Sequence, residues 1–352
     1  NWNDLEVNDI ELTAHGLRFK DGIMYGTAES LSFKERTGFN CHFMSGDTRV
    51  GRGKTIVENL IIQDDFSDLT LPLYMMSYTG VKDFNDFISK VKLDAEIYPS
   101  VLDFRTLTFF APQLEGNNLK ATVSGIMSGY VDNFEVKDIN INSHAGGFST
   151  TLNGKMKGIP EVYDMWIDCR LSNLKFTPGG LGRFISEWIP EGSLDWNNYG
   201  KNCRFSGWAS ARGYLNRLNV NTSLKSTDGG LTADAQLAEI INPKKPITVT
   251  GKVKTEQLNL GKIINNDIIG PTSVSAGAQI SIDKSMTIDL DSLRVYQMML
   301  NDYNYRDIQA RGRIDSKSMN GTVISKDPNL NFIFQGGYAR SDKSQNTVYK
   351  FN

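Results

Sequence analysis

Apolar residues recur at every second position through residues 276–336. The segment alternates Ala278, Ile280 and Ile282 with polar residues, turns, and alternates again over 286–290. In a pleated strand, side chains at every second position share one face. We therefore predict successive strands that form a sheet with one apolar face and one polar face.

The same alternation continues through most of the chain. Turn dipeptides such as Asp21-Gly22 and Asn153-Gly154 separate the apolar runs and indicate hairpins. Roughly 20 strands spaced about 4.8 Å apart would extend on the order of 100 Å. We therefore predict a mainly β fold, an elongated and curled antiparallel sheet that forms a repeating β-groove, with a few short amphipathic helices.

Four segments have helical instead of strand periodicity. Near 83–91, apolar residues follow at i, i+3, i+4 and i+7, which predicts a short amphipathic helix. We expect three more helices near 100–111, 181–189 and 256–265, the first of these capped by Ser100. Helices with one apolar face would cover the rim of a sheet, where exposed apolar surface invites aggregation.

No linker rich in Ser, Gly or Pro and no block of like charge divides the chain. We predict that residues 1–180 form the N-terminal part of the β-groove, with the first two helices. Residues 181–352 are predicted to continue the groove with the other two helices.

Composition and charge exclude several classes of partner. A net charge of -2 and a pI near 6.0 give no basic surface for nucleic acid. No window approaches the roughly 18 continuous apolar residues of a membrane-spanning helix, and no signal peptide begins the sequence, so we expect a soluble chain. Three cysteines are too few for a disulfide framework and are expected to be small buried hydrophobes, with a Cys169–Cys203 bridge as the alternative.

Candidate catalytic and metal-binding motifs are weak. Residues 51–55 resemble a phosphate-binding loop, but Thr48 replaces its first glycine and a strand pattern follows. His15, His42 and His144 lie far apart and have no ligand pairs nearby. The carboxylates fall mostly in the polar phase of strands, as on a solvated face. We expect no enzyme activity, no metal and no cofactor.

Several short motifs occur in an order that is typical of one family. They are LSFKERTGF at 31–39, IVENL at 56–60, the segment 76–87, LTFFAPQL at 107–114, GIP at 158–160, NYRDI at 304–308 and DPNL at 327–330. In this order the chain resembles the TamB/AsmA-like (translocation and assembly module) family of bacterial envelope proteins, in its Bacteroidetes-type form. The resemblance covers nearly the whole chain and is weakest over 181–199.

The resemblance implies a taco-shaped β-groove that bridges the periplasm. Such proteins are linked to phospholipid transfer between the inner and outer membranes and to outer-membrane protein biogenesis with a BamA/TamA-like barrel. Family members carry an inner-membrane anchor and a C-terminal signature domain, so this chain is expected to be an internal, periplasmic fragment.

The first functional hypothesis is a lipid-conducting groove. Exposing an acyl chain of about 15 methylenes to water costs on the order of 12 kcal/mol, which an apolar groove would avoid. The residues predicted to line it are Phe148, Leu152, Met165, Ile167, Phe205, Val220, Ile280, Ile282, Ile288, Leu290, Phe332 and Phe334.

Three alternatives remain open. The same apolar residues would also close a β-sandwich. Exposed strand edges, expected near Lys252 and Lys326, would suit a scaffold that donates strands to outer-membrane barrels. A surface glycan-binding β-protein would use Trp2, Trp196 and Trp208 as stacking platforms.

Overall fold

The computed structural model describes residues 6–36, 38–109, 116, 118–159, 161, 164–186, 200, 203–240, 244–283, 285–340 and 347–351. The predicted fold class is confirmed, because 72% of the structure is strand and 9% is helix, in an antiparallel sheet that is not closed into a barrel. The chain forms two compact units. Unit 1 comprises Asn1–Ser172 and Gly180–Ser193, and unit 2 comprises Asn173–Gly179 and Leu194–Asn352.

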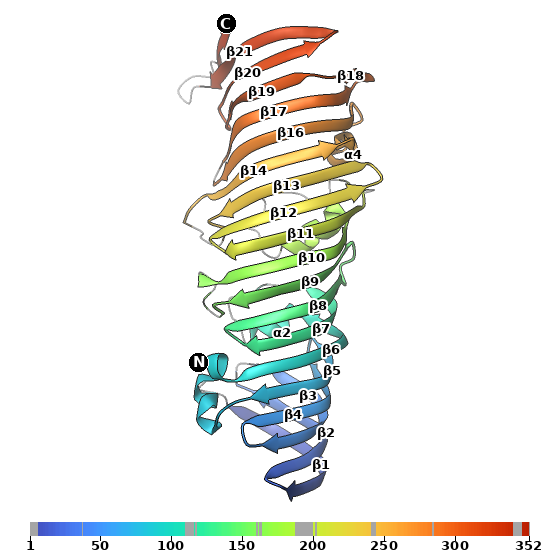
Figure 1. The fold of residues 1–352 in the computed structure, drawn as a ribbon, viewed down its shortest axis with the longest axis vertical. Helices are drawn as coiled ribbons and strands as arrows, with labels where there is room; N and C mark the ends of the chain where they lie inside the picture. The colour runs from blue at the N-terminus through green and yellow to red at the C-terminus, as the bar shows by residue number, and fades with distance from the viewer. Residues whose placement is uncertain are drawn as a thin grey trace. The chain divides into compact units, whose positions relative to one another are not determined.

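Unit 1 is a ladder in which each strand pairs antiparallel with the next one in sequence (Figure 1). Its strands are β1 (Val7–Lys20), β2 (Ile23–Glu35), β3 (Asn40–Gly51), β4 (Lys54–Asp64), β5 (Asp68–Ser77), β6 (Lys92–Asp103), β7 (Lys120–Tyr130), β8 (Asn133–Ser143) and β9 (Phe148–Lys157). The following strand, β10 (Trp166–Phe176), spans the division between the units.

Unit 2 repeats this hairpin order, except that the short strands β15 and β18 lie beside the main ladder, so β14 pairs with β16 and β17 with β19. Its strands are β11 (Phe205–Tyr214), β12 (Arg217–Ser226), β13 (Gly229–Ala238), β14 (Ile247–Glu256), β15 (Leu258–Asn259), β16 (Ile269–Ile282), β17 (Met286–Leu300), β18 (Tyr303–Tyr305), β19 (Ile308–Ile314), β20 (Ser318–Asp327), β21 (Leu330–Arg340) and β22 (Thr347–Phe351).

The helices are short. They are η2 (Val81–Asp86), α1 (Phe87–Lys90), α2 (Phe104–Thr108), α3 (Pro178–Ser186) and α4 (Leu260–Ile264). The first two fall at the helix predicted near 83–91, and α3 covers the described part of the one predicted near 181–189. The helix predicted near 256–265 is shorter, because Leu258 and Asn259 pair with β16 as a strand and Asn259 then caps α4 through the backbone N–H of Lys262.

The prediction that Ser100 caps the second helix was wrong. Ser100 lies inside β6, where its hydroxyl donates to the Tyr98 carbonyl and accepts from the Thr70 N–H. The cap is Asp103, whose carboxylate accepts from the backbone N–H of Arg105. Because β6 stays paired through Asp103, the helix begins only at Phe104.

Bulges keep apolar residues on one face where the alternation slips. Asn59 and Asp138 adopt left-handed backbone with φ of 53° and 51°, a conformation that short polar side chains tolerate. The registers of β3–β4 and β8–β9 shift beside them. Because a bulge inserts one extra residue, Val57 and Leu60 face the same side although they are three positions apart.

The core of unit 1 lies on this apolar face. Leu60, Leu71 and Ala95, from β4, β5 and β6, are at most 8% exposed and pack together. Half-buried neighbours surround them, namely Met44, Val57, Ile62, Leu69, Tyr74, Ile97 and Met127.

A hydrogen-bonded cluster joins α2 to the β4–β5 turn in unit 1. The buried Thr106 hydroxyl lies 2.9 and 3.0 Å from the two Asp64 carboxylate oxygens and 2.7 Å from the Ser67 hydroxyl. The Ser67 hydroxyl in turn accepts from the backbone N–H of Asp103. Buried polar contacts therefore hold this short helix against the β4–β5 turn.

Candidate functional site

The eight predicted lining residues of unit 2 share one face of its ladder. Residues paired directly across antiparallel strands point to the same side. Ile280 pairs with Ile288, and Ile282 pairs with Met286. Following such pairs from strand to strand identifies the residues that share this side of the sheet from β11 to β21. We call it the apolar face of unit 2. The predicted residues on it are Phe205, Val220, Ile280, Ile282, Ile288, Leu290, Phe332 and Phe334.

Small side chains dominate one row across this face, which we call the central row. From β11 to β21 its cross-strand partners are Ala211, Val220, Ala235, Gly251, Ala278, Leu290, Gly312, Gly321 and Gly336. The neighbouring row, which we call the flanking row, is large and apolar. From β12 to β21 it contains Leu218, Leu237, Val249, Ile280, Ile288, Ile314, Met319 and Tyr338.

Large apolar side chains on this face reach solvent near the C-terminal end of unit 2. Their exposed fractions are 38% for Ile282, 53% for Met286, 39% for Ile314, 40% for Met319, 37% for Phe332 and 39% for Tyr338. Contiguous exposed apolar surface on a folded protein marks an interaction site. Four of these residues, Met286, Ile314, Met319 and Tyr338, were not among the predicted lining residues, although the same alternation includes them.

Phe205 differs from the other predicted residues of unit 2. It is 6% exposed and stacks on Phe176, with ring centroids 5.4 Å apart. Its ring therefore contributes to the packed start of unit 2 and offers little accessible surface.

Three of the four predicted residues of unit 1 lie on its last strands, and the fourth, Met165, lies just before β10. Leu152 pairs with Ile139 on the apolar face of β8 and β9, and Phe148 lies two pairs further along the same face. Phe148 is buried beneath α3, where its ring stacks on Phe184 at 4.2 Å. Ile167 lies on β10, and Met165 precedes that strand, both half-buried.

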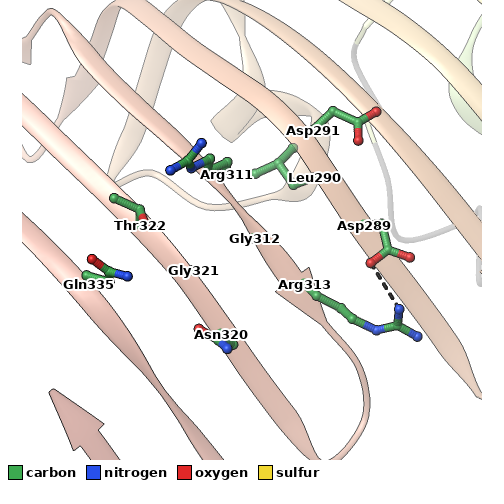
Figure 2. A pocket seen from close by; sticks show the side chains of 10 residues that line it. All are labelled: Asp289, Leu290, Asp291, Arg311, Gly312, Arg313, Asn320, Gly321, Thr322 and Gln335. Atoms are coloured by element: carbon green, nitrogen blue, oxygen red, sulfur yellow. Dashed lines mark ion pairs between the residues drawn. The ribbon is translucent and has the colours of Figure 1, made fainter. Parts of the chain in front are cut away.

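An open depression of about 460 Å³ lies between β17, β19, β20 and β21, lined mostly by side chains of the polar face together with Leu290, Gly312 and Gly321 of the central row (Figure 2). Arg313 forms an ion pair with Asp289 there, at 3.3 Å. Arg311, Thr322 and Gln335 line the same depression. These groups are those of a solvated polar surface, and the arrangement contains no nucleophile with a neighbouring base.

The weak motifs occupy structural positions. Residues 51–55 lie at the β3–β4 hairpin, so no helix follows to form a phosphate site. His15 pairs with Glu29 at 3.0 Å, and His42 pairs with Asp65. Within the described ranges, no group of three or more His, Cys, Asp or Glu residues gathers where a metal ion would bind.

The cysteines are free thiols, so the alternative Cys169–Cys203 bridge is absent. Cys41 and Cys203 are buried as predicted, and burial raises the pKa of both thiols. Cys169 is half-buried.

Two of the three tryptophans proposed for glycan stacking, Trp2 and Trp196, lie outside the described residues. Trp208 lies on the polar face of β11, opposite Ser223. Lys252 and Lys326 were expected at strand edges, but each lies on an interior strand with a partner on both sides, so that prediction was wrong.

The described helices are all too short or too polar to cross a membrane. Comparisons of the chain with protein families, curated proteins and solved structures found no match.

Proposed function

We propose that the apolar face of unit 2 carries lipid acyl chains, as part of a periplasmic protein that transfers phospholipid between the inner and outer membranes or takes part in outer-membrane protein biogenesis. The observation that supports this best is the set of large apolar side chains exposed in register on one side of β16 to β21. The resemblance to TamB/AsmA-like proteins, which are linked to phospholipid transfer, supports the same proposal.

The pattern of side-chain sizes favours a linear apolar ligand. Glycine and alanine place no large side chain in most of the central row, and the larger side chains of the flanking row border it. The row crosses successive strands, which are spaced about 4.8 Å apart. An extended acyl chain lying along it would remove apolar surface from water, at about 0.8 kcal/mol per methylene.

Native mass spectrometry of protein purified from cells tests this proposal. We expect co-purified phospholipid on the wild-type chain and a strong loss of it in Phe332→Glu, which places a carboxylate on the apolar face. The matched control is Ile333→Glu, because Ile333 is 75% exposed on the opposite face of the same strand. Absence of lipid from the wild type, or equal loss in both variants, would contradict the proposal.

A strand-donating scaffold remains the second candidate, and β1 favours it. In the described part of the chain β1 pairs with β2 alone. Its apolar side chains are unusually exposed, at 60% for Ile10 and Leu12, 72% for Leu17 and 77% for Phe19. An unpaired apolar edge is a template for another strand. Photo-crosslinking from Leu12 should trap a barrel protein if this function holds, and trapping lipid alone would count against it.

A further inference from the structure

The two ends of the strands in unit 2 form two rims of different composition. Because the ladder is antiparallel, successive connections alternate between the two ends of the strands. One end, the first rim, carries the connections β11–β12, β13–β14, β16–β17, β19–β20 and β21–β22. The other end, the second rim, carries the remaining connections together with α4 and β18, which lie on the same side of the unit in Figure 1.

The first rim has an excess of positive charge. We count the described residues in its connections together with the strand residues that border them. Five cations lie there, against three carboxylates from Glu239, Asp283 and Asp315. The cations are Arg217, Lys244, Lys245, Lys317 and Arg340. Neither Arg217 nor Arg340 pairs with a carboxylate in the part of the chain that the structure describes.

The second rim has the opposite balance. Counted in the same way over its described residues, and including Arg204 before β11, it holds three cations, the others being Lys262 and Arg306. Six carboxylates lie there, on Asp228, Glu256, Asp267, Asp302, Asp307 and Asp327. Lys262 forms an ion pair with Asp228 here, as Lys245 does with Glu239 at the first rim, so ion pairing leaves the net charge of each rim unchanged.

Exposed apolar side chains lie beside the positive rim. Ile282 ends β16 and Met286 begins β17, directly opposite each other. Ile314 ends β19 and pairs with Met319, which pairs in turn with Tyr338. All five belong to the apolar face of unit 2 and lie within three residues of the first-rim ends of their strands. Cationic and apolar surfaces therefore adjoin at this rim.

We propose that unit 2 holds an amphiphile with an anionic headgroup in one orientation, with the headgroup at the first rim and the acyl chain on the apolar face. This inference rests on the proposed lipid-carrying function and adds the charge class and the orientation of the ligand. Attraction to the positive first rim and repulsion from the negative second rim both favour an anionic headgroup at the first rim over the second.

Equilibrium binding of two lysophospholipids of equal chain length tests the inference. We expect lysophosphatidylglycerol, whose headgroup is anionic, to bind about fivefold more tightly than zwitterionic lysophosphatidylcholine at low ionic strength, because exposed charge pairs contribute modestly. The preference should vanish near 1 M salt, where the screening length falls to about 3 Å.

A pair of double variants locates the effect. Arg217→Gln with Arg340→Gln, at the first rim, should remove most of the preference for the anionic lipid. Arg204→Gln with Arg306→Gln removes the same two charges from the second rim and should preserve the preference or increase it. Equal affinity for both lipids, or the same loss of preference in both double variants, would overturn the inference while lipid binding itself persisted. If neither lipid binds, the proposed function is overturned instead.

Discussion

The core of unit 1 and the C-terminal strands of unit 2 have the same alternation but different packing. Leu60, Leu71 and Ala95 are nearly inaccessible within a cluster from three neighbouring strands. In unit 2, Met286 and Met319 occupy equivalent phases of their strands and remain about half exposed. Alternation therefore specifies which side of a strand is apolar, while the size and arrangement of neighbouring side chains decide whether that side is closed.

Side-chain size accounts for much of the difference. In unit 1 the residues around the cluster are large, including Tyr74, Ile97 and Met127, and they fill the space between strands. In unit 2 the central row consists of glycine on β19, β20 and β21, at Gly312, Gly321 and Gly336. The large side chains in the rows on either side therefore have no side chain from the central row to pack against there.

The largest expected effect comes from replacing the same residue type in the two regions. Leu71→Ala, at 8% exposure, should lower the free energy of unfolding of unit 1 by about 2–5 kcal/mol, because it leaves a cavity in a packed cluster. Leu330→Ala, at 41% exposure on the apolar face of unit 2, should cost less than about 1 kcal/mol. Urea unfolding of both variants measures the difference. Similar losses would mean that the face of unit 2 is packed as tightly as the core.

Gly312→Ala tests whether the backbone of the open region is itself tightly fixed. A Cβ at Gly312 would lie 2.3 Å from the Asn320 carbonyl oxygen and 2.8 Å from the Gly321 Cα. The strands must separate to admit it, so we expect thermal unfolding to show a loss of about 1–3 kcal/mol. Gly80→Ala is the control, because a Cβ there meets no atom within 4 Å. Equal stability of the two variants would indicate that β19 and β20 separate freely.

Thr106→Val tests how much the buried hydrogen bonds between α2 and the β4–β5 turn contribute to the stability of unit 1. The substitution keeps the shape of the side chain but removes the hydroxyl that contacts Asp64 and Ser67, leaving buried polar groups unsatisfied. We expect a loss of about 1–3 kcal/mol in chemical unfolding. Thr322→Val, on the polar face of unit 2, should change stability by less than about 0.5 kcal/mol. An equal effect at both sites would show that the α2 contacts add nothing.

The smallest expected effect is a pH dependence at the same helix. Burial alone would raise the pKa of Asp103, but hydrogen bonds from the Arg105 guanidinium and backbone, together with its charge, outweigh burial and lower the pKa. A carboxyl whose pKa is lower in the folded state stabilises the fold above its unfolded pKa of about 3.9, and this contribution is lost as the pH falls through the folded value. Asp103→Asn should therefore be less stable than wild type at pH 7, and the gap should narrow below about pH 4. A gap that stays constant down to pH 2 would contradict this assignment.

The sequence predicted sidedness and hairpin order well, because both follow from local alternation and turn residues. It missed the start of α2, since Ser100 resembles a helix cap until the pairing of β6 with β7 is known. It also misassigned Lys252 and Lys326 to edges, because strand neighbours are a property of the whole ladder.

For the candidate site, the sequence identified which face the predicted lining residues share but not how accessible each side chain is. Phe148 and Phe205 have the same alternation as Phe332, yet aromatic rings from α3 and β10 cover them. Those contacts join residues far enough apart in the chain that no local pattern reveals them. The charge difference between the two rims likewise becomes visible only once each connection is assigned to one end of the ladder.

Site-specific photo-crosslinking on β20 tests the central claim most directly. Val323 pairs with Phe334 on the apolar face, while its neighbour Thr322 pairs with Gln335 on the polar face. A benzophenone amino acid at position 323, irradiated in cells, should form a phospholipid adduct detectable by mass spectrometry, and the same probe at position 322 should form none. Lipid adducts at both positions in equal yield, or at neither, would contradict a lipid-carrying apolar face.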